Sequence, residues 1–186
     1  MTSEPDGKNK LVIVLDTSAL IGGFDPFSVK DEQYTPPKVR EELTEETLHG
    51  LRLKTAIENG RIQLKTPEET SVEKTKTFAF KLGDSFFLSE TDIQVLALAL
   101  ELKEKGYSPI IATDDYSIQN VATRMGIHFA PITTFGIRRQ LEWMRYCPAC
   151  HKKYPANYKS RKCEVCGTDL KRKSIRKAQT LREQRV

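Results

Sequence analysis

Four cysteines stand in two close pairs near the C-terminus of this chain. The pairs are Cys147-Pro-Ala-Cys150 and Cys163-Glu-Val-Cys166, and they account for all the cysteines of the sequence. Two C-x-x-C turns about a dozen residues apart have the ligand spacing of a structural zinc site built from four thiolates. Residues 147–170 contain few apolar side chains, so we expect one zinc ion to hold them together as a zinc ribbon. Two disulfides or reactive thiols are the alternative interpretation.

The charge of the chain is divided unevenly. Residues 1–137 contain 15 Lys and Arg against 21 Asp and Glu, and residues 138–186 contain 15 against 4, so the net charges are −6 and +11. An acidic domain joined to a basic module is typical of a protein that binds a polyanion. No apolar run has the length of a transmembrane helix, and residues 1–10 are too polar for a signal peptide. We therefore expect a cytoplasmic protein that has no membrane partner.

Short apolar segments alternate with helical patterns before the cysteines. Residues 11–15 and 109–112 predict strands that are buried on both faces, as in a parallel sheet. Further strands are expected at 34–35, 61–64 and 127–129, and helices at 17–20, from 37, at 45–59, 73–82 and 90–105, and after 115. This order predicts a doubly wound α/β domain. The predicted organisation is a flexible N-terminus (1–10), the α/β domain (11–136), a linker (137–146), the zinc ribbon (147–170) and a basic tail (171–186).

Several acidic residues fall where an open α/β sheet places its ligands, just past the carboxyl ends of strands and at helix starts. Asp16 follows the first strand, and Asp114 and Asp115 follow the strand that ends at 112. Asp92 lies in the first turn of a helix with a capping box at its start, and Glu42 lies on the helix after the second strand. Any one of these acids can be a plain helix cap. Together, an oxygen-only cluster favours Mg²⁺ or Mn²⁺, ions that activate water for attack on a phosphate.

Four short segments, in this order, resemble the PIN-domain ribonucleases over residues 11–136. They are Val-Leu-Asp16-Thr-Ser-Ala, Val39-Arg-Glu-Glu42-Leu, Leu88-Ser-Glu-Thr-Asp92-Ile and Ala112-Thr-Asp-Asp115-Tyr. With the two cysteine pairs behind them, the chain resembles the Nin-one-binding (NOB) family of ribosome-biogenesis endonucleases in its compact archaeal form.

This resemblance implies a metal-dependent endonuclease that cleaves single-stranded precursor rRNA at the 3′ end of the small-subunit rRNA. Its expected partners are that RNA and ribosomal particles of the pre-40S or pre-30S type, with no small-molecule substrate. The residues that match the family's metal-binding acids are Asp16, Glu42, Asp92 and Asp115. Asp114 is a neighbouring candidate, and a different helix register exchanges Glu42 for Glu41.

The basic half of the chain is the expected platform for RNA. The candidate contacts are Arg145, Lys152, Lys153, Tyr154, Tyr158, Lys159, Arg161 and Lys162. The two tyrosines can stack on bases, although Tyr154 fits equally well into the thin core of the ribbon. Two other functions remain open: a non-catalytic RNA-binding assembly factor and a toxin-type PIN ribonuclease. The full set of acids argues against the first, and the ribbon with its basic tail argues against the second.

Overall fold

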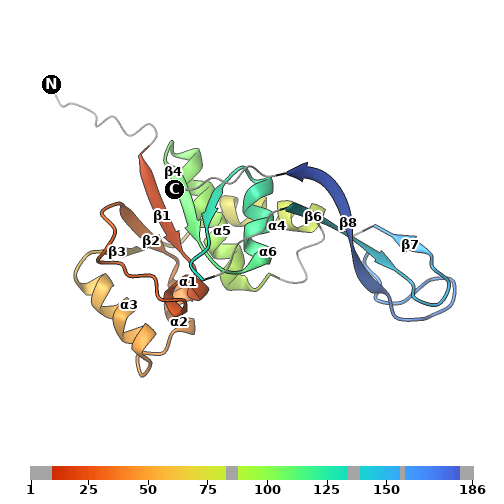
Figure 1. The fold of residues 1–186 in the computed structure, drawn as a ribbon, viewed down its shortest axis with the longest axis horizontal. Helices are drawn as coiled ribbons and strands as arrows, with labels where there is room; N and C mark the ends of the chain where they lie inside the picture. The colour runs from red at the N-terminus through yellow and green to blue at the C-terminus, as the bar shows by residue number, and fades with distance from the viewer. Residues whose placement is uncertain (1–9, 83–87, 134–138, 156–157, 181–186) are drawn as a thin grey trace.

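The computed structural model describes residues 10–82, 88–133, 139–155 and 158–180. These residues form an α/β domain followed by a smaller module of β-strands (Figure 1). The domain contains a five-stranded sheet with the order β3-β2-β1-β4-β5. Its strands are β1 Leu11–Leu15, β2 Glu32–Thr35, β3 Ile62–Leu64, β4 Ser108–Ala112 and β5 His128–Ala130. Every pair of neighbouring strands in it is parallel, which confirms the predicted doubly wound parallel sheet.

The central strand of this sheet is β1. All of its residues are apolar, so both of its faces can be covered, and Val12, Val14 and Leu15 have no exposed surface. It pairs with β2 on one side and β4 on the other, with Leu15 in register with Ala112. From β1 the chain continues to β2 and β3 on one side of the sheet, and from β4 it continues to β5 on the other side. The space beyond their carboxyl ends is therefore the topological switch point, where open α/β sheets bind their ligands.

Helices connect these strands. They are α1 Thr17–Ile21, α2 Pro37–Glu42, α3 Leu48–Glu58, α4 Glu69–Leu82, α5 Glu90–Glu104 and α6 Tyr116–Arg124. The central helix is α5, which is buried over nearly its whole length and packs against β1, β4, α4 and α6. The helix predicted over 73–82 begins earlier than expected, because α4 starts at Glu69. The Glu68 carbonyl accepts the first helical hydrogen bonds, and the buried carboxylate of Glu101 holds the Glu68 N–H at 2.8 Å.

The smaller module is a three-stranded antiparallel sheet with the order β7-β6-β8 (Figure 1). Its strands are β6 Arg139–Tyr146, β7 Lys153–Tyr154 and β8 Lys171–Thr180. The predicted linker over 137–146 and basic tail over 171–186 therefore need correction, since most of both segments is strand. Trp143 pairs with Ser174 and Tyr146 with Lys171 across the intervening cysteine segment, a long-range pairing that local composition does not reveal.

Parts of the predicted organisation lie outside the described residues. They are residues 1–9 of the expected flexible N-terminus, 83–87 and 134–136 of the expected α/β domain, 137–138 of the expected linker, 156–157 of the expected ribbon and 181–186 of the expected tail. Within the segments that the structure describes, we find no helix whose length and apolar character would let it cross a membrane.

Candidate active site and metal centre

Asp16 lies at the carboxyl end of β1 and caps the N-terminus of α1. Its Oδ2 atom accepts hydrogen bonds from the Ser18 hydroxyl at 2.6 Å and from the Thr113 hydroxyl at 2.8 Å. The side chain is buried, with 3% of the residue exposed. Burial raises the pKa of Asp16, and the hydroxyl groups of Ser18 and Thr113 oppose that shift by stabilising the carboxylate.

Glu42 is the last residue of α2. Its Oε2 atom accepts a hydrogen bond of 2.6 Å from the hydroxyl of Thr17, the residue that follows Asp16. Glu41 is turned elsewhere, because its Oε2 atom lies 3.5 Å from the ammonium group of Lys38. The structure therefore places Glu42, and not Glu41, beside the end of β1.

Asp92 stands in the first turn of α5, in a capping box with Ser89. The Ser89 N–H donates to Oδ2 of Asp92 at 2.7 Å, and the Asp92 N–H donates to the Ser89 hydroxyl at 3.1 Å. Burial raises the pKa of Asp92 to about 6, and the bonds from Ser89 only partly oppose this shift. The negative charges of Asp16 and Asp115 raise it further, so these three acids share one electrostatic environment.

Asp115 follows β4 and caps α6. Its Oδ1 atom accepts hydrogen bonds from the N–H groups of Ser117 at 2.6 Å and Ile118 at 3.3 Å. The backbone N–H of Asp115 donates to the Thr113 hydroxyl at 3.0 Å. Thr113 thus connects the acids that follow β1 and β4. Sequence reasoning overlooked this role, although a hydroxyl residue directly after a buried strand was a usable signal.

The carboxylate of Asp114, unlike that of Asp115, binds the segment that follows β5. It accepts hydrogen bonds from the N–H groups of Ile132 and Thr133 and, at 2.6 Å, from the Thr133 hydroxyl. Its backbone N–H donates to the Ser18 hydroxyl at 2.9 Å. Asp114 therefore holds segment 132–133 against the candidate active site, and Asp115 is the acid of this pair that stands beside Asp92.

The sheet thus brings the four predicted acids to its switch point. Three of them also cap helices, as the structural interpretation of each acid expected. An acid can cap a helix and also bind a metal ion, because each carboxylate has two oxygen atoms. In these three acids the short hydrogen bonds go to one oxygen: Oδ2 in Asp16 and Asp92, and Oδ1 in Asp115. An oxygen-only set of negative charges that repel one another suits Mg²⁺ or Mn²⁺.

The four cysteines converge in the smaller module. Their sulfur atoms all lie within 4.8 Å of one another, and among the described residues the carboxylates form no group as tight. Sγ of Cys147 lies 3.3 Å from Sγ of Cys166, and Sγ of Cys150 lies 3.5 Å from Sγ of Cys163. A disulfide requires about 2.05 Å, so these thiols are free. Zinc–sulfur bonds of about 2.3 Å in a tetrahedron place sulfur atoms about 3.8 Å apart, which this cluster approaches.

The two C-x-x-C turns repeat one backbone pattern. In each turn the residue after the second cysteine donates its N–H to the carbonyl of the first, from His151 to Cys147 and from Gly167 to Cys163. That residue has positive φ, 60° at His151 and 72° at Gly167. Glycine adopts this conformation without a steric penalty, and histidine tolerates it better than a β-branched residue does.

Tyr154 belongs to the core of this module. It is 5% exposed, and its hydroxyl lies 3.0 Å from Sγ of Cys163. Its ring packs against Tyr158 with 4.4 Å between the centroids. The prediction that Tyr154 stacks on a base therefore needs correction, because the packing alternative is the one that the structure shows. Tyr158 is half-buried, and its hydroxyl donates to Glu164.

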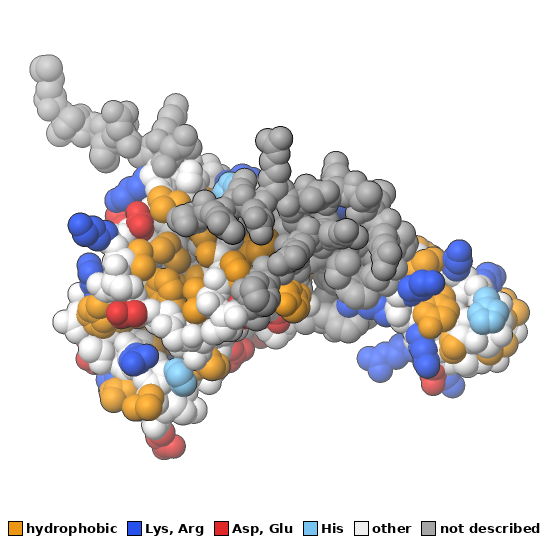
Figure 2. Space-filling view, in the orientation of Figure 1, with side chains coloured by type: hydrophobic (Ala, Val, Ile, Leu, Met, Phe, Trp, Pro, Cys, Tyr) orange, Lys and Arg blue, Asp and Glu red, His pale blue; other side chains and the backbone are white. Residues whose placement is uncertain are grey.

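The predicted basic contacts lie on the surface of the same module, where Figure 2 shows Lys and Arg side chains around the ribbon. Lys153, Lys159, Arg161 and Lys162 are exposed. Lys152 is also exposed but forms an ion pair with Glu164. Arg145 is half-buried and donates to the Ser160 carbonyl at 3.0 Å.

Comparison with known proteins gives a consistent result. Residues 13–102 match the family model described as the PIN domain of ribonuclease. The chain is 37% identical over 165 residues to endoribonuclease Nob1 of Methanocaldococcus jannaschii, covering 89% of this chain and 79% of the relative. It is also 37% identical over 163 residues to endoribonuclease Nob1 of Methanothermobacter thermautotrophicus, covering 88% and 93%. Ribonuclease VapC1 of Thermoplasma acidophilum is 33% identical over 162 residues, covering 87% and 78%. PIN-domain nucleases depend on divalent metal ions.

Proposed function

Because the chain belongs to the Nob1 family of PIN-domain endoribonucleases, we propose that it cleaves single-stranded precursor rRNA at the 3′ end of the small-subunit rRNA. Maturing small ribosomal particles of the pre-30S or pre-40S type are the proposed setting. The observation that supports this proposal best is the meeting of Asp16, Glu42, Asp92 and Asp115 beyond the carboxyl ends of the sheet. Metal-dependent phosphodiester cleavage needs such a set of oxygen ligands, whereas RNA binding alone does not.

We propose that these four acids hold Mg²⁺ or Mn²⁺. When bound, such an ion lowers the pKa of a water nucleophile and offsets charge on the attacked phosphate. The chain itself supplies rigidity: the hydroxyls of Ser18 and Thr113 fix the buried carboxylate of Asp16, and the capping box fixes that of Asp92. Burial raises the pKa of Asp92, and repulsion from Asp16 and Asp115 raises it further. A cation between these carboxylates relieves that repulsion.

We propose one zinc ion for the cysteine cluster, because four free thiols at near-tetrahedral spacing match zinc chemistry. Burial acts to raise the pKa of Cys163, but the hydroxyl of Tyr154 and the backbone N–H groups of Cys166 and Val165 together outweigh it and lower this pKa to about 6. A thiolate stabilised in this way is ready to bind a metal ion. In this proposal zinc stabilises the ribbon, and exposed basic side chains on it bind the RNA backbone.

The proposed cleavage is tested on a precursor fragment that spans the mature 3′ end. We expect a single Mn²⁺- or Mg²⁺-dependent cut at that end, and its loss in Asp16→Asn with an intact melting transition. Asp31→Asn, an exposed acid, is the matched control and should cleave normally. Full cleavage by Asp16→Asn would show that the active site lies elsewhere. Lost cleavage together with a collapsed melting transition would instead support a purely structural role for Asp16.

The similarity to ribonuclease VapC1 supports a second candidate function, that of a toxin-type ribonuclease. Ribonuclease VapC1 aligns with 87% of this chain, so the ribbon by itself does not exclude a toxin-type ribonuclease. Such an enzyme would cut RNAs other than the precursor and would not copurify with small ribosomal subunits. A non-catalytic assembly factor would copurify with subunits and bind the fragment, but would leave it intact at every metal concentration.

A further inference from the structure

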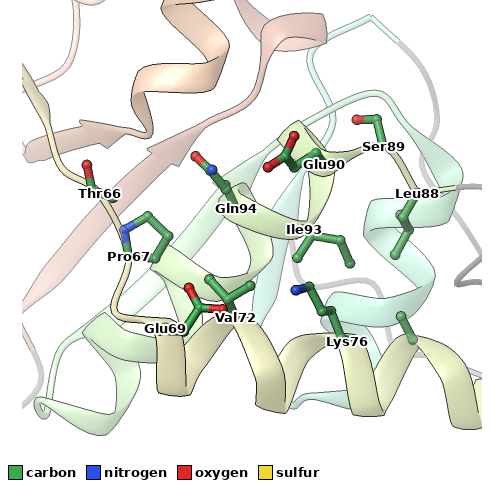
Figure 3. Close-up of a pocket in the computed structure, with 11 residues that line it drawn as sticks. Thr66, Pro67, Glu69, Val72, Lys76, Leu88, Ser89, Glu90, Ile93 and Gln94 are labelled. Carbon is green, nitrogen blue, oxygen red and sulfur yellow. The ribbon is translucent and has the colours of Figure 1, made fainter.

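A groove of about 410 Å³ opens between α4, the start of α5 and the segment after β3. Figure 3 shows side chains reaching into it from both helices, with Thr66 and Pro67 on one side and Leu88 and Ser89 on the other. Its lining includes the polar and charged residues Glu69, Lys76, Ser89, Glu90 and Gln94. Its volume falls within the range of about 300–1,000 Å³ that is usual for pockets that bind small molecules.

The groove lies directly beside the proposed catalytic acids. Ser89 lines it, and the N–H of Ser89 donates to the carboxylate of Asp92 at 2.7 Å. Thr66 and Pro67 come just after β3, and the carboxyl ends of parallel strands meet at one edge of a sheet. An RNA strand with its cleaved phosphate at Asp92 therefore has a neighbouring nucleotide within reach of this groove.

The walls of the groove suit a base better than a phosphate. Val72, Leu88 and Ile93 supply apolar surface for the faces of a flat ring. Two carboxylates, Glu69 and Glu90, stand against one ammonium group, Lys76, so the charge of the lining is −1. Lys38 pairs with Glu90 and Glu73 pairs with Lys76, and these two partners cancel one another, so the balance stays at −1. That charge repels a phosphate and favours a group that presents hydrogen-bond donors.

The polar groups also select among bases. Within the described residues, Oε1 of Gln94 is buried and has no hydrogen-bond partner, so it is an acceptor that a ligand can satisfy after a rotation of the amide. Glu69 reaches toward α5 from α4 (Figure 3) and offers two further acceptors. Guanine presents neighbouring N1–H and N2–H donors to such a carboxylate, and its O6 and N7 atoms accept from an ammonium group such as that of Lys76.

We propose that this groove binds the base of a guanosine that flanks the cleaved bond, an inference that rests on the proposed endoribonuclease function. The base packs between the apolar walls, its donor edge faces Glu69 and Gln94, and its acceptor atoms face Lys76. The groove thereby contributes to the choice of cleavage site, while the acids carry out the chemistry.

Inosine substitution tests this proposal, since inosine lacks only the N2 amino group of guanosine. Short single-stranded RNAs with a mapped cut are prepared with each flanking guanosine replaced in turn by inosine. For the native chain with Mn²⁺, we expect one position at which inosine raises KM by about 5- to 150-fold with little change in kcat. In Glu69→Gln and Gln94→Leu that ratio should fall to within about twofold of unity, whereas Glu58→Gln, on the exposed end of α3, should keep it.

The outcomes separate this inference from the function on which it rests. If the native chain cleaves no RNA with any divalent ion, the proposed function fails and this inference fails with it. Metal-dependent cleavage with equal KM for guanosine and inosine at every position would overturn the groove proposal alone. Discrimination that persists in Glu69→Gln and Gln94→Leu, both with native melting temperatures, would also overturn it, because the base would then be bound elsewhere.

Discussion

At the scale of single residues, Asp92 has the most telling environment. Its pKa is raised from 3.8 to about 6 in the folded chain. Because the folded-state pKa is the higher one, the stability that this group contributes is fully present below pH 3.8 and is lost as the pH rises through about 6. The Asp92→Asn variant cannot ionise at this position, so it does not lose this stability at high pH. At pH 7.5 without divalent ions, we expect it to raise the free energy of unfolding by on the order of 1 kcal/mol, allowing for solvent screening of this half-buried group.

Thermal melts at pH 7.5 and pH 4.5 measure this effect. The gain in Asp92→Asn should shrink at the lower pH, where native Asp92 is largely protonated, and Asp31→Asn should show no such pattern. Added Mn²⁺ should raise the melting temperature of the native chain but not that of the variant. A variant that melts below the native chain at pH 7.5 would contradict the proposed electrostatic environment.

The adjacent acids Asp114 and Asp115 should respond differently to substitution. Asp115→Asn is expected to abolish cleavage with little effect on the melting temperature, because the asparagine oxygen can still cap α6. Asp114→Asn weakens the hydrogen bonds to segment 132–133 and should cost about 1–2 kcal/mol of stability while cleavage survives. Cleavage rates and denaturant unfolding of the two variants, measured side by side, check this. Loss of cleavage in Asp114→Asn at native stability would reverse the assignment.

At the scale of elements, α3 packs tightly against the turn that follows α2, the helix that carries Glu42. A Cβ atom added to Gly50 would lie 2.0 Å from the carbonyl oxygen of Thr44, because the turn after α2 crosses the helix there. Gly50→Ala must therefore displace that turn, and we expect a loss of about 1–3 kcal/mol of stability. Glu42 lies two residues before Thr44, so cleavage should fall as well. Arg52→Ala, on the exposed face of the same helix, is the control and should remain within about 0.5 kcal/mol. Native stability in Gly50→Ala would mean that the turn is free to move.

At the scale of the whole molecule, the two parts should differ in their dependence on zinc. The α/β domain has a continuous apolar core, whereas among the described side chains the buried hydrophobic cluster of the ribbon consists of Cys147, Tyr154 and Cys163. A structural zinc ion contributes about 10–16 kcal/mol to small modules, far more than that cluster can. Chelation should therefore collapse the amide dispersion of residues 147–170 in NMR spectra while the signals of 11–130 persist. Unchanged dispersion over 147–170 would contradict a structural zinc site.

The charge of the whole molecule predicts where RNA binds. Arg161→Gln and Lys162→Gln in the basic module should each weaken RNA binding and reduce the slope of log affinity against log salt by about 1 if the side chain contacts a phosphate. Lys54→Gln, in the acidic domain, is the control, since Lys54 pairs with Glu45. If all three variants bind RNA with the same affinity across a salt series, the ribbon is not part of the RNA-binding surface.

The sequence by itself determined the features that depend on residues close together in the chain. The buried strand 11–15, the capping box at Ser89 and the spacing of the cysteines each depend on neighbouring residues, so all three could be recognised without coordinates. The acids Asp16 and Asp115 could be placed at one edge of the sheet for the same reason, since each directly follows a strand. The family followed from the order of these short segments along the chain.

Only the tertiary structure decided the features that depend on contacts between distant segments. It turned Glu42 toward Thr17 and Glu41 toward Lys38, and it directed Asp114 to Thr133. It paired β6 with β8, although β8 looks like a basic polar tail, and it buried Tyr154 against the cysteines. Hydrogen bonding and packing across long stretches of chain set these choices, because a shift of one residue rotates a side chain by about 100° around a helix and moves it to the opposite face of a strand.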